Sequence, residues 1–440
     1  MKQTLEIALL GCGIVGSGVA KILTDQRDLL RQRTGHTFNI RHIVVRDPSK
    51  TREALPVVPT RDANAALNDP DVDVYVELIG GTTVAGEYLQ RALHLGKPVV
   101  TANKSLLAAR GPELFALARK QKTCIAFEAS CGGGIPIIDA LTRGLLANRI
   151  DALVGIVNGT CNFILTKMTK EGATYADALK EAQAAGFAEA DPTLDVSGRD
   201  AAQKLALLAG LAFNAHVTEQ DIHIEGIDTL QAADIGFASE LGYVIKLLAI
   251  AERSRSISDA SGKLSLRVHP TLVHKSDVLA EVGGSFNAIS IYGHALGHSL
   301  FYGRGAGQMP TASAVVADLI GVAMGTTQLA FSQLNIFPDV VSRPSIMPVD
   351  ERQSRYYLRL AAKDQPGVLA QVTKALGDNG ISLSAILQHE ENDSQRVPVV
   401  ITTHRASEGA IRGALKTIDA LPTIQPPTVC LRIIDQPAEF

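Results

Sequence analysis

Residues 186–213, GFAEADPTLDVSGRDAAQKLALLAGLAF, combine an acidic loop with an apolar run in which Lys204 is the one charge. Asp200 and Lys204 are four residues apart, so on a helix they lie on the same face. The positions around Lys204 are almost all apolar, which is typical of a buried helix, and a buried charge is usually paired. The spacing therefore predicts either a salt bridge at the mouth of a core helix or a lysine that takes part in chemistry.

A second lysine, Lys104, follows directly after an expected strand at residues 97–101. Open α/β sheets bind their ligands at the carboxyl ends of the strands, so this position suits a lysine that acts on a substrate or cofactor. A solvated lysine at the start of the next helix explains the same position equally well.

The glycine loop GCGIVG lies between an apolar run at residues 7–10 and a helical pattern that continues to Leu29. A strand, such a loop and a helix form the dinucleotide-binding fingerprint, in which glycines let the backbone approach a pyrophosphate at the helix N-terminus. The predicted cofactor contacts are Gly11, Gly13, Ile14, Val15 and Gly16.

The expected second strand, at residues 40–45, ends in the sequence RDPSK. At this place an arginine favours the 2′-phosphate of NADP, whereas an acidic residue favours the free 2′-hydroxyl of NAD. Arg46 and Lys50 therefore predict NADP, and Asp47 leaves NAD open.

Three further loops contain small residues that a ligand could approach. The sequence EASCGGGIP at residues 128–136 could ligate a hard cation through main-chain carbonyls, although a plain strand-to-helix turn also explains it. Gly159 and Thr160 lie in a polar turn that suits a substrate carboxylate, or is an ordinary tight turn. The sequence GRGAG at residues 303–307 is a second glycine-rich turn, which could close over the cofactor.

Length, charge and cysteine content narrow the class of protein. A chain of 440 residues predicts two or three domains, and a net charge of −3 gives no reason to expect nucleic acid or a membrane as partner. No stretch approaches the roughly 20 apolar residues of a membrane span, and the N-terminal apolar run is too short for a signal peptide. Five scattered cysteines argue against a disulfide framework. We expect a cytoplasmic protein that acts on small molecules.

The order of the expected elements predicts an α/β chain with three parts. Residues 1–135, completed by a returning segment at about 303–335, are expected to form a Rossmann-type NAD(P)-binding domain. Residues 136–337 are expected to form an α+β substrate-binding and dimerisation domain with a mixed or antiparallel sheet. After a linker at residues 338–355, residues 356–440 follow the strand, helix, strand, strand, helix, strand order of a ferredoxin-like fold. The expected bounds of these elements are 356–362, 368–378, 382–388, 397–403, 407–420 and 429–434.

Together these motifs resemble the homoserine dehydrogenase family, in the longer form that carries a C-terminal ACT domain. The resemblance extends from GCGIVG through TANKSLLA, EASCGGGIP, VNGTCNFIL and GFAEADPTLDVSGRDAAQKLA to GRGAG and KDQPGVLA, and covers essentially the whole chain. It implies the reversible interconversion of L-aspartate 4-semialdehyde and L-homoserine with NAD(P)H, on the route to threonine, methionine and isoleucine. We also expect a homodimer or homotetramer.

The resemblance implies a role for each candidate residue of the active site. Lys204 exchanges a proton with the substrate oxygen, and Asp200 holds it. Lys104 assists beside the nicotinamide, and Gly305 is a further cofactor contact. The resemblance also implies that Glu189 and Asp195 bind the amino-acid part of the substrate, to which the turn at Gly159 and Thr160 adds further candidate contacts. It implies a sodium-like cation on the main-chain carbonyls of Glu128, Cys131, Gly133 and Ile135.

The C-terminal module implies regulation by an amino acid. An ACT domain usually binds its ligand near the loop after its first strand, and threonine as feedback inhibitor is the ligand implied here. The candidate contacts are Asp364, Gly367, Asn379 and Ile381. A purely structural dimerisation module is the alternative.

Two other functions remain open. One is a different amino- or oxo-acid NAD(P) dehydrogenase on the same scaffold, and the other is a non-catalytic sensor of NADP and an amino acid. The sensor predicts a loss of charge at Lys104, Asp200 or Lys204, and all three charges are present.

Overall fold

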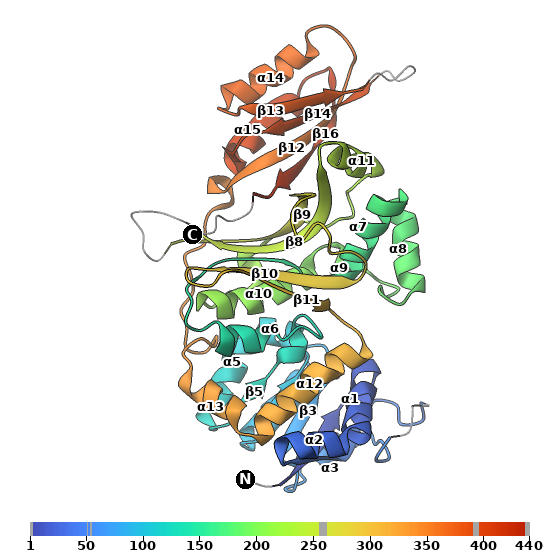
Figure 1. Ribbon diagram of the computed structural model, residues 1–440, viewed down its shortest axis with the longest axis vertical. Coiled ribbons are helices and arrows are strands. Elements are labelled where there is room, and N and C mark those ends of the chain that lie inside the picture. Colours follow the sequence, from blue (N-terminus) through green and yellow to red (C-terminus); the bar gives the residue numbers. More distant parts are fainter. Residues whose placement is uncertain (1–2, 51, 53–54, 255–261, 390–395, 436–440) are drawn as a thin grey trace. The chain divides into compact units, whose positions relative to one another are not determined.

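The structure is a computed structural model that describes residues 3–50, 52, 55–254, 262–389 and 396–435. The chain forms two compact units, which are traced in Figure 1. Unit 1 consists of Met1–Leu153, Asp200–Ile222 and Phe286–Pro344, and unit 2 of Val154–Arg199, His223–Ser285 and Ser345–Phe440. Each unit is therefore assembled from three separate stretches of the chain.

Unit 1 contains a five-stranded parallel sheet in the order β2-β1-β3-β4-β5. Ile7 to Leu10 on β1 are all fully buried, as expected for a strand covered by helices on both faces. The strand order reverses between β1 and β3, and ligands bind sheets of this kind at the carboxyl ends of the strands beside that point. The strands are β1 (Thr4–Leu10), β2 (Thr37–Val44), β3 (Val74–Glu77), β4 (Val99–Thr101) and β5 (Ile125–Ala126).

Helices from distant parts of the chain cover the unit 1 sheet. The helix α1 (Ile14–Asp25) packs against α12 (Gln308–Ala323), and α4 (Val84–His94) packs against α5 (Lys104–Lys120) (Figure 1). The other helical segments of this unit are α2 (Arg27–Thr34), α3 (Ala63–Leu67), η1 (Glu128–Ser130), α6 (Ile137–Asp139), η2 (Ala140–Gly144), α10 (Arg199–Phe213), η3 (Glu219–Asp221) and α13 (Thr326–Gln333).

The helix predicted to continue to Leu29 is interrupted at Gln26, so that α1 and α2 are separate. The Thr24 hydroxyl donates to the Ala20 carbonyl at 2.8 Å. Such a contact in the last turn competes with the helical backbone ladder and often bends it.

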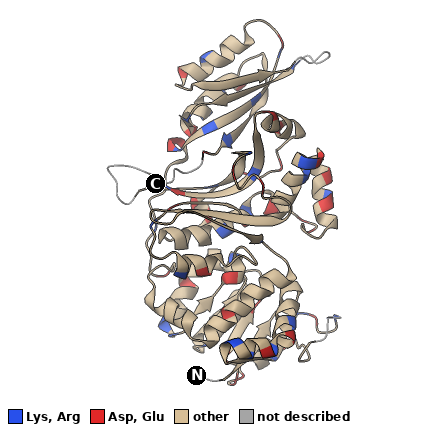
Figure 2. Cartoon of the chain, in the orientation of Figure 1, with Lys and Arg blue, Asp and Glu red and all other residues tan. Residues whose placement is uncertain are grey.

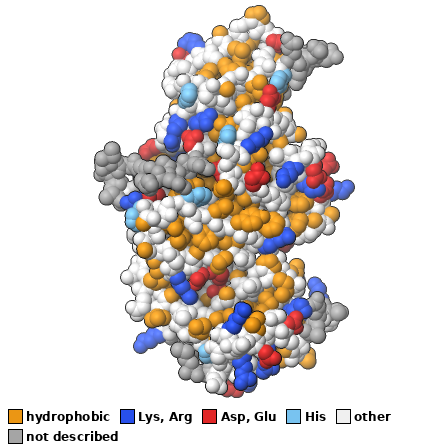
Figure 3. Space-filling view, viewed as in Figure 1, with side chains coloured by type: hydrophobic (Ala, Val, Ile, Leu, Met, Phe, Trp, Pro, Cys, Tyr) orange, Lys and Arg blue, Asp and Glu red, His pale blue; other side chains and the backbone are white. Residues whose placement is uncertain are grey.

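Unit 1 also contains an antiparallel hairpin of β10 (Phe286–Gly293) and β11 (Gly297–Arg304). β10 is almost wholly buried, whereas the side chains of Leu300 and Tyr302 on β11 are exposed. On the face drawn in Figure 3, hydrophobic side chains gather where Figure 1 places this hairpin.

Unit 2 contains a mixed sheet in the order β8-β9-β16-β12-β14-β13, which confirms the mixed sheet expected after the first domain. β9 is antiparallel to β8 and parallel to β16 and β7. The helices α7 and α8 carry both basic and acidic side chains, as Figure 2 shows. The elements before the C-terminal module are β6 (Ile150–Ile156), which starts in unit 1, α7 (Gly159–Glu171), α8 (Tyr175–Ala184), α9 (Thr193–Val196), β7 (His223–Ile224), α11 (Ala232–Glu240), β8 (Tyr243–Arg253) and β9 (Leu264–His274).

The C-terminal module has the ferredoxin-like order that the sequence predicts, with antiparallel neighbours in the order β16-β12-β14-β13. Its core lies between the sheet and its two helices, and includes Tyr356, Leu376 and Ile411. The elements are η4 (Val349–Glu351), β12 (Gln353–Ala362), α14 (Val368–Asp378), β13 (Leu383–Gln388), β14 (Val397–Thr403), β15 (Ala406–Ser407), α15 (Glu408–Asp419) and β16 (Ile424–Ile433).

Two strands of this module begin earlier than the sequence indicates. β12 begins at Gln353, inside the stretch expected to be a linker, because Gln353 pairs with Ser407 of β15. β16 begins at Ile424 rather than Val429, and includes two prolines. The register of β16 against β12 shifts at these prolines, where no backbone N–H is needed for the ladder.

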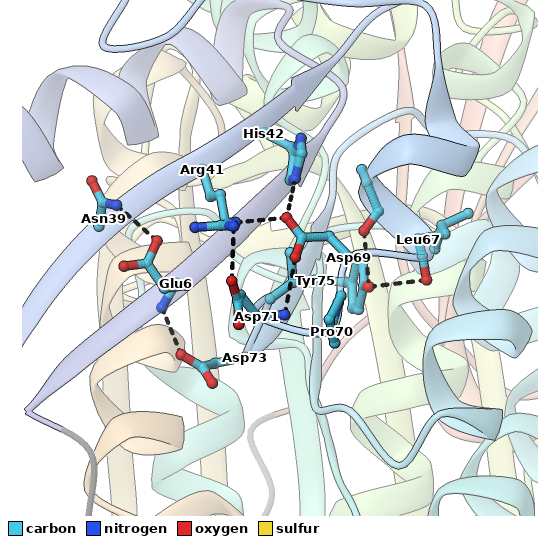
Figure 4. Close-up of polar contacts among 12 residues, drawn as sticks. Glu6, Asn39, Arg41, His42, Leu67, Asp69, Pro70, Asp71, Asp73 and Tyr75 are labelled. Atoms are coloured by element: carbon cyan, nitrogen blue, oxygen red, sulfur yellow. Dashed lines mark hydrogen bonds and ion pairs between the residues drawn. The ribbon is translucent and has the colours of Figure 1, made fainter.

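A polar cluster fixes the loop that leads into β3 (Figure 4). Asp69 accepts a hydrogen bond from Arg41 Nε at 2.6 Å and lies 2.7 Å from His42 Nε2. The hydrogen bonds from Arg41 and His42 hold the pKa of the Asp69 carboxyl well below its usual range. Asp71 pairs with the same guanidinium at 2.9 Å. These contacts join β2 to the following loop and have a structural role.

Within the described part of the chain, no single helix has the length and apolar character needed to cross a membrane. α12 and α13 meet that test of length and composition only as a pair that is bent by 80°.

Candidate active site

One buried carboxylate holds both candidate lysines. Asp200 Oδ2 lies 2.8 Å from Lys204 Nζ, and Asp200 Oδ1 lies 3.1 Å from Lys104 Nζ. The Asp200 side chain is only 7% exposed, and Lys104 at 25% is the more exposed of the two lysines. The predicted Asp200–Lys204 pair is confirmed. The contact to Lys104 joins two helices and was not foreseen from the spacing.

The position of Lys104 is set by a chain of buried polar contacts at the ends of β3 and β4. Glu77, which is fully buried, accepts a hydrogen bond from the Thr101 hydroxyl at 2.6 Å. Thr101 Oγ1 in turn accepts the backbone N–H of Asn103 at 3.0 Å. The Asn103 side chain caps α5 through the Leu106 N–H, so Lys104 begins the helix in a fixed orientation.

A second side-chain contact joins α5 to α10 one residue away from each lysine. Ser105 Oγ donates to Gln203 Oε1 at 2.8 Å, and Gln203 Nε2 donates to Glu219 at 3.3 Å. The two helices are thus joined by two polar contacts, Lys104 with Asp200 and Ser105 with Gln203. Sequence reasoning missed Ser105, Gln203 and Glu77. A buried acid at the end of an otherwise apolar strand was a usable signal for Glu77.

The glycine loop has the geometry that a dinucleotide requires. Gly11 has φ +99°, and a side chain there would come within 2.6 Å of the Leu78 backbone. Gly13 faces open space and precedes α1, whose first turn has no side-chain cap. The first backbone N–H groups of α1 are therefore available to a pyrophosphate. Ile14 is 74% exposed at this end of the helix, and Val15 follows it.

The loop after β2 exposes Arg46 and Lys50. A third basic residue, Arg52, holds the loop in place: its guanidinium donates to the carbonyls of Cys12, Lys50 and Asp47 at 2.9–3.0 Å. Arg52 joins this loop to the glycine loop, and sequence reasoning missed it because its partners are backbone atoms.

The second glycine-rich turn packs on a buried asparagine. A side chain at Gly305 would overlap the Asn287 carboxamide, and one at Gly133 would come within 2.6 Å of the Gly305 backbone. Asn287 is fully buried, and neither polar atom of its carboxamide has a partner among the described residues. The turn that contains Gly305 therefore packs closely against the 128–135 loop. This close packing restricts the backbone conformations of both segments.

The candidate cation loop is buried, and its side chains are engaged elsewhere. The Glu128 carboxyl accepts the backbone N–H groups of Ile138 and Asp139 at 2.9 and 2.7 Å. Burial raises the pKa of Glu128 to about 7, against these hydrogen bonds. The described residues contain no group of three or more His, Cys, Asp or Glu side chains that could hold a metal. The cation ligands expected in this loop are main-chain carbonyls, those of Glu128, Cys131, Gly133 and Ile135.

In unit 2, the polar turn before α7 contacts one of the two candidate substrate carboxylates. Asn158 Nδ2 donates to Asp195 Oδ1 at 2.7 Å, and the Thr160 hydroxyl lies 3.2 Å from Asp195 Oδ2. Asn158 also caps α7, which begins at Gly159. Asp195 and Thr160 are thus brought together as a unit, whereas Glu189 is exposed at the end of the preceding loop.

In the C-terminal module, Asp364 and Gly367 are exposed beside the start of α14. Asn379 donates to the Ala375 carbonyl at 2.8 Å, and the side chain of Ile381 is buried in the core of the module. Ile381 can therefore contact an amino acid at this loop only through its backbone.

Comparisons with known proteins agree with this geometry. Three family models match: "Homoserine dehydrogenase, NAD binding domain" at residues 11–128, "Homoserine dehydrogenase" at 136–320 and "ACT domain" at 356–423. The homoserine dehydrogenase of Pseudomonas aeruginosa is 43% identical over 435 residues, which cover 98% of this chain and 99% of that protein. This chain belongs to the homoserine dehydrogenase family. The resemblance that the motifs indicate is thereby confirmed.

Solved structures of homoserine dehydrogenases share the fold. That of the enzyme from Thiobacillus denitrificans is 40% identical, with a TM-score of 0.91 and 98% of both chains covered. A hyperthermophilic archaeal homoserine dehydrogenase mutant in complex with NADPH is 26% identical, with a TM-score of 0.60, and matches 73% of this chain and 98% of its own. The chain is thus a homoserine dehydrogenase, an oxidoreductase that acts on a CH–OH group with a nicotinamide cofactor.

Proposed function

We propose that Lys204 transfers the proton when this enzyme interconverts L-aspartate 4-semialdehyde and L-homoserine. The observation that carries the proposal is the single buried carboxylate of Asp200, which holds the ammonium groups of Lys204 and Lys104. Reduction of an aldehyde needs a hydride, which the nicotinamide supplies when bound, and a proton for the carbonyl oxygen. Lys204 donates that proton and takes it back in the reverse reaction, while Asp200 fixes its direction.

Lys104 has a separate part in this proposal. Its ammonium group, on the other oxygen of the Asp200 carboxylate, adds a second positive charge that stabilises the negative charge developing on the substrate oxygen. Glu77, Thr101 and Asn103 hold the helix that starts at Lys104, so this charge is preorganised.

We further propose that the substrate's amino-acid part is bound by unit 2. The carboxylates of Asp195 and Glu189 attract its ammonium group, and the turn at Gly159 and Thr160 offers donors to its carboxylate. The hydrogen bonds from Asn158 and Thr160 to Asp195 support this proposal, because they fix one of the two carboxylates in place.

For the cofactor we propose a preference for NADP over NAD. Arg46 and Lys50 are exposed after β2, where a 2′-phosphate is recognised in this fold. The NADPH complex of the archaeal relative supports the preference. We also propose a sodium-like cation on the carbonyls of the 128–135 loop, as the family resemblance implies.

The remaining proposals concern the enzyme's setting. We propose that it is cytoplasmic and serves the synthesis of threonine, methionine and isoleucine. We also propose that threonine inhibits it through its ACT domain. A homodimer or homotetramer is supported by the exposed apolar residues of β11, which pairs with β10 along one edge.

The central experiment follows NADPH formation from L-homoserine and NADP. Lys204→Ala is expected to lower kcat by about 10²–10⁴-fold, the usual contribution of a general acid or base. Lys204→Arg keeps the charge but is a poor proton donor, so it should remain impaired. Lys120→Ala, on the exposed far end of α5, is the control and should keep full activity. An undiminished kcat in Lys204→Ala would overturn the proposal.

A further inference from the structure

A pocket of about 600 Å³ in unit 2 lies between the C-terminal module and β7. Its walls come from α15 and β16 of the module and from His223 and Glu225 at β7. The pocket is therefore lined by α15, whereas Asp364 and Gly367 precede the other helix of the module, α14. The family motifs, the substrate residues and the predicted effector loop all leave this pocket without a role.

One wall of the pocket is a row of charges, in which Arg432 and Glu408 are buried and Glu225 is partly exposed. Arg432 on β16 forms ion pairs with Glu225 on one side and with Glu408 on the other. Glu225 also contacts His223 Nε2 at 2.8 Å, and Glu408 accepts the Tyr356 hydroxyl at 2.9 Å. Burial alone would raise the pKa of Glu225, but His223 and Arg432 lower it to about 2, so it is a carboxylate at neutral pH.

The part of α15 beyond Glu408 forms a second wall, which has a different chemistry. The partly exposed side chain of Leu415 gives it an apolar surface, and Arg412 stands at its exposed edge. One guanidinium nitrogen of Arg412 contacts Asp350 at 3.0 Å, and the side chain is 54% exposed. A guanidinium can make up to five hydrogen bonds, so this contact leaves donors for a ligand.

The two walls together match the groups of a small aliphatic amino acid. Two carboxylates and two guanidinium groups balance each other in charge, which favours a zwitterion over a simple anion or cation. Glu225 and Glu408 suit the α-ammonium group, and Arg412 suits the α-carboxylate. The apolar side chain of Leu415 then faces the aliphatic side chain of the ligand.

The pocket is also connected to the candidate substrate residues of the same unit. Glu225 is followed by Gly226, where any side chain would overlap the Val196 carbonyl, and by Ile227, whose N–H donates to that carbonyl at 2.8 Å. Val196 directly follows Asp195 in α9. A movement of Glu225 toward a ligand therefore acts on the backbone that carries Asp195.

We propose that this pocket binds a small aliphatic α-amino acid as a zwitterion, and that occupancy weakens homoserine binding through Glu225 and the turn that carries Asp195. This rests on the proposed amino-acid regulation of the enzyme, and moves the effector from the loop before α14 to the α15–β16 side of the module. Bound effector is expected to raise KM for homoserine more than it lowers kcat.

The test titrates L-threonine, L-isoleucine and L-methionine separately into the full-length enzyme by calorimetry and by inhibition of NADPH formation. Arg412→Glu is expected to weaken binding of the active amino acid at least tenfold. Lys416→Glu makes the same charge change on the exposed face of the same helix, outside the pocket, and should leave binding unchanged. Leu415→Trp, which fills the pocket, should abolish inhibition, whereas Lys416→Trp should not.

The results distinguish a wrong binding site from a lack of regulation by amino acids. Loss of inhibition in Asp364→Arg, with Arg412→Glu and Leu415→Trp unaffected, would overturn the pocket and keep regulation through the ACT loop. Failure of all three amino acids to bind the wild type would overturn regulation as well. Neither result bears on catalysis, which is read from uninhibited turnover. Inhibition that lowers only kcat would overturn the proposed link to Asp195.

Discussion

Asp200 and Lys104 are joined by an ion pair of 3.1 Å between Oδ1 and Nζ, although they belong to different helices. The same carboxylate binds Lys204 at 2.8 Å on α10 itself. Two ammonium groups thus share one buried negative charge, and the site keeps one net positive charge. A developing alkoxide is stabilised by such a charge in a partly dry environment.

Asp200→Asn is therefore expected to remove both the charge balance and the orientation of the lysines. We expect kcat to fall by about 10²-fold or more, the scale of losing an oriented general acid, with a smaller change in KM. The control is Asp25→Asn, which breaks another i,i+4 Asp–Lys pair, with Lys21, on the surface of α1. Equal losses in both variants would show that Asp200 acts through stability alone.

The part of this site that the sequence revealed is the part that is local. Asp200 and Lys204 are one helical turn apart, so their spacing alone predicts the contact. Lys104 reaches Asp200 through the tertiary packing of α5 on α10, which no short-range pattern encodes. The partners of Arg52 are backbone carbonyls, which leave no trace in the sequence.

The bounds of helices and strands were likewise predicted well where they depend on local sequence and poorly where they depend on tertiary contacts. α14 and β14 have the predicted bounds because their apolar periodicity is undisturbed. β16 was predicted too short, because Pro426 and Pro427 are residues more typical of a loop than of a strand. A register shift in its pairing with β12 is a tertiary feature that lets the strand continue through them.

Arg46 and Arg52 follow β2, and their substitution is expected to affect cofactor binding in different ways. Arg46→Ala should raise KM for NADP by about tenfold or more and leave NAD almost unchanged, since only NADP has the 2′-phosphate. Arg52→Ala should weaken both cofactors, because Arg52 holds the Cys12 carbonyl of the glycine loop. Steady-state kinetics with each cofactor measure this, with Arg33→Ala on α2 as the control. Equal losses of NAD and NADP in Arg46→Ala would refute the NADP preference.

Asp69 is expected to make stability depend on pH. Its pKa is lowered in the folded state, so its contribution is present above the unfolded value of about 4 and is lost as pH falls below it. Asp69→Asn should lower the free energy of unfolding by about 1–3 kcal/mol at neutral pH, the range for hydrogen bonds to a charged group. In urea titrations the deficit should shrink below about pH 4.

The matched control for that experiment is Asp71→Asn. Asp71 pairs with the same Arg41 but is 65% exposed, so its removal should cost about 0–1 kcal/mol. A deficit in Asp69→Asn that stays constant down to about pH 2 would mean that lost packing, not charge, is its cause.

Asp195 and Asp191 lie in the same acidic loop of unit 2 and provide a matched pair for substrate binding. Asp195 is held by Asn158 and Thr160, whereas Asp191 accepts hydrogen bonds from Thr193 within its own turn. If Asp195 binds the ammonium group of homoserine, Asp195→Asn should raise KM for homoserine by about 10–100-fold, since a charge-assisted hydrogen bond contributes about 1.5–3 kcal/mol. KM for NADP should not change. Asp191→Asn removes the same charge from the loop and should leave both constants within about twofold. A rise in KM for homoserine in both variants would assign the effect to the general negative charge of the loop, and the specific role of Asp195 would then be wrong.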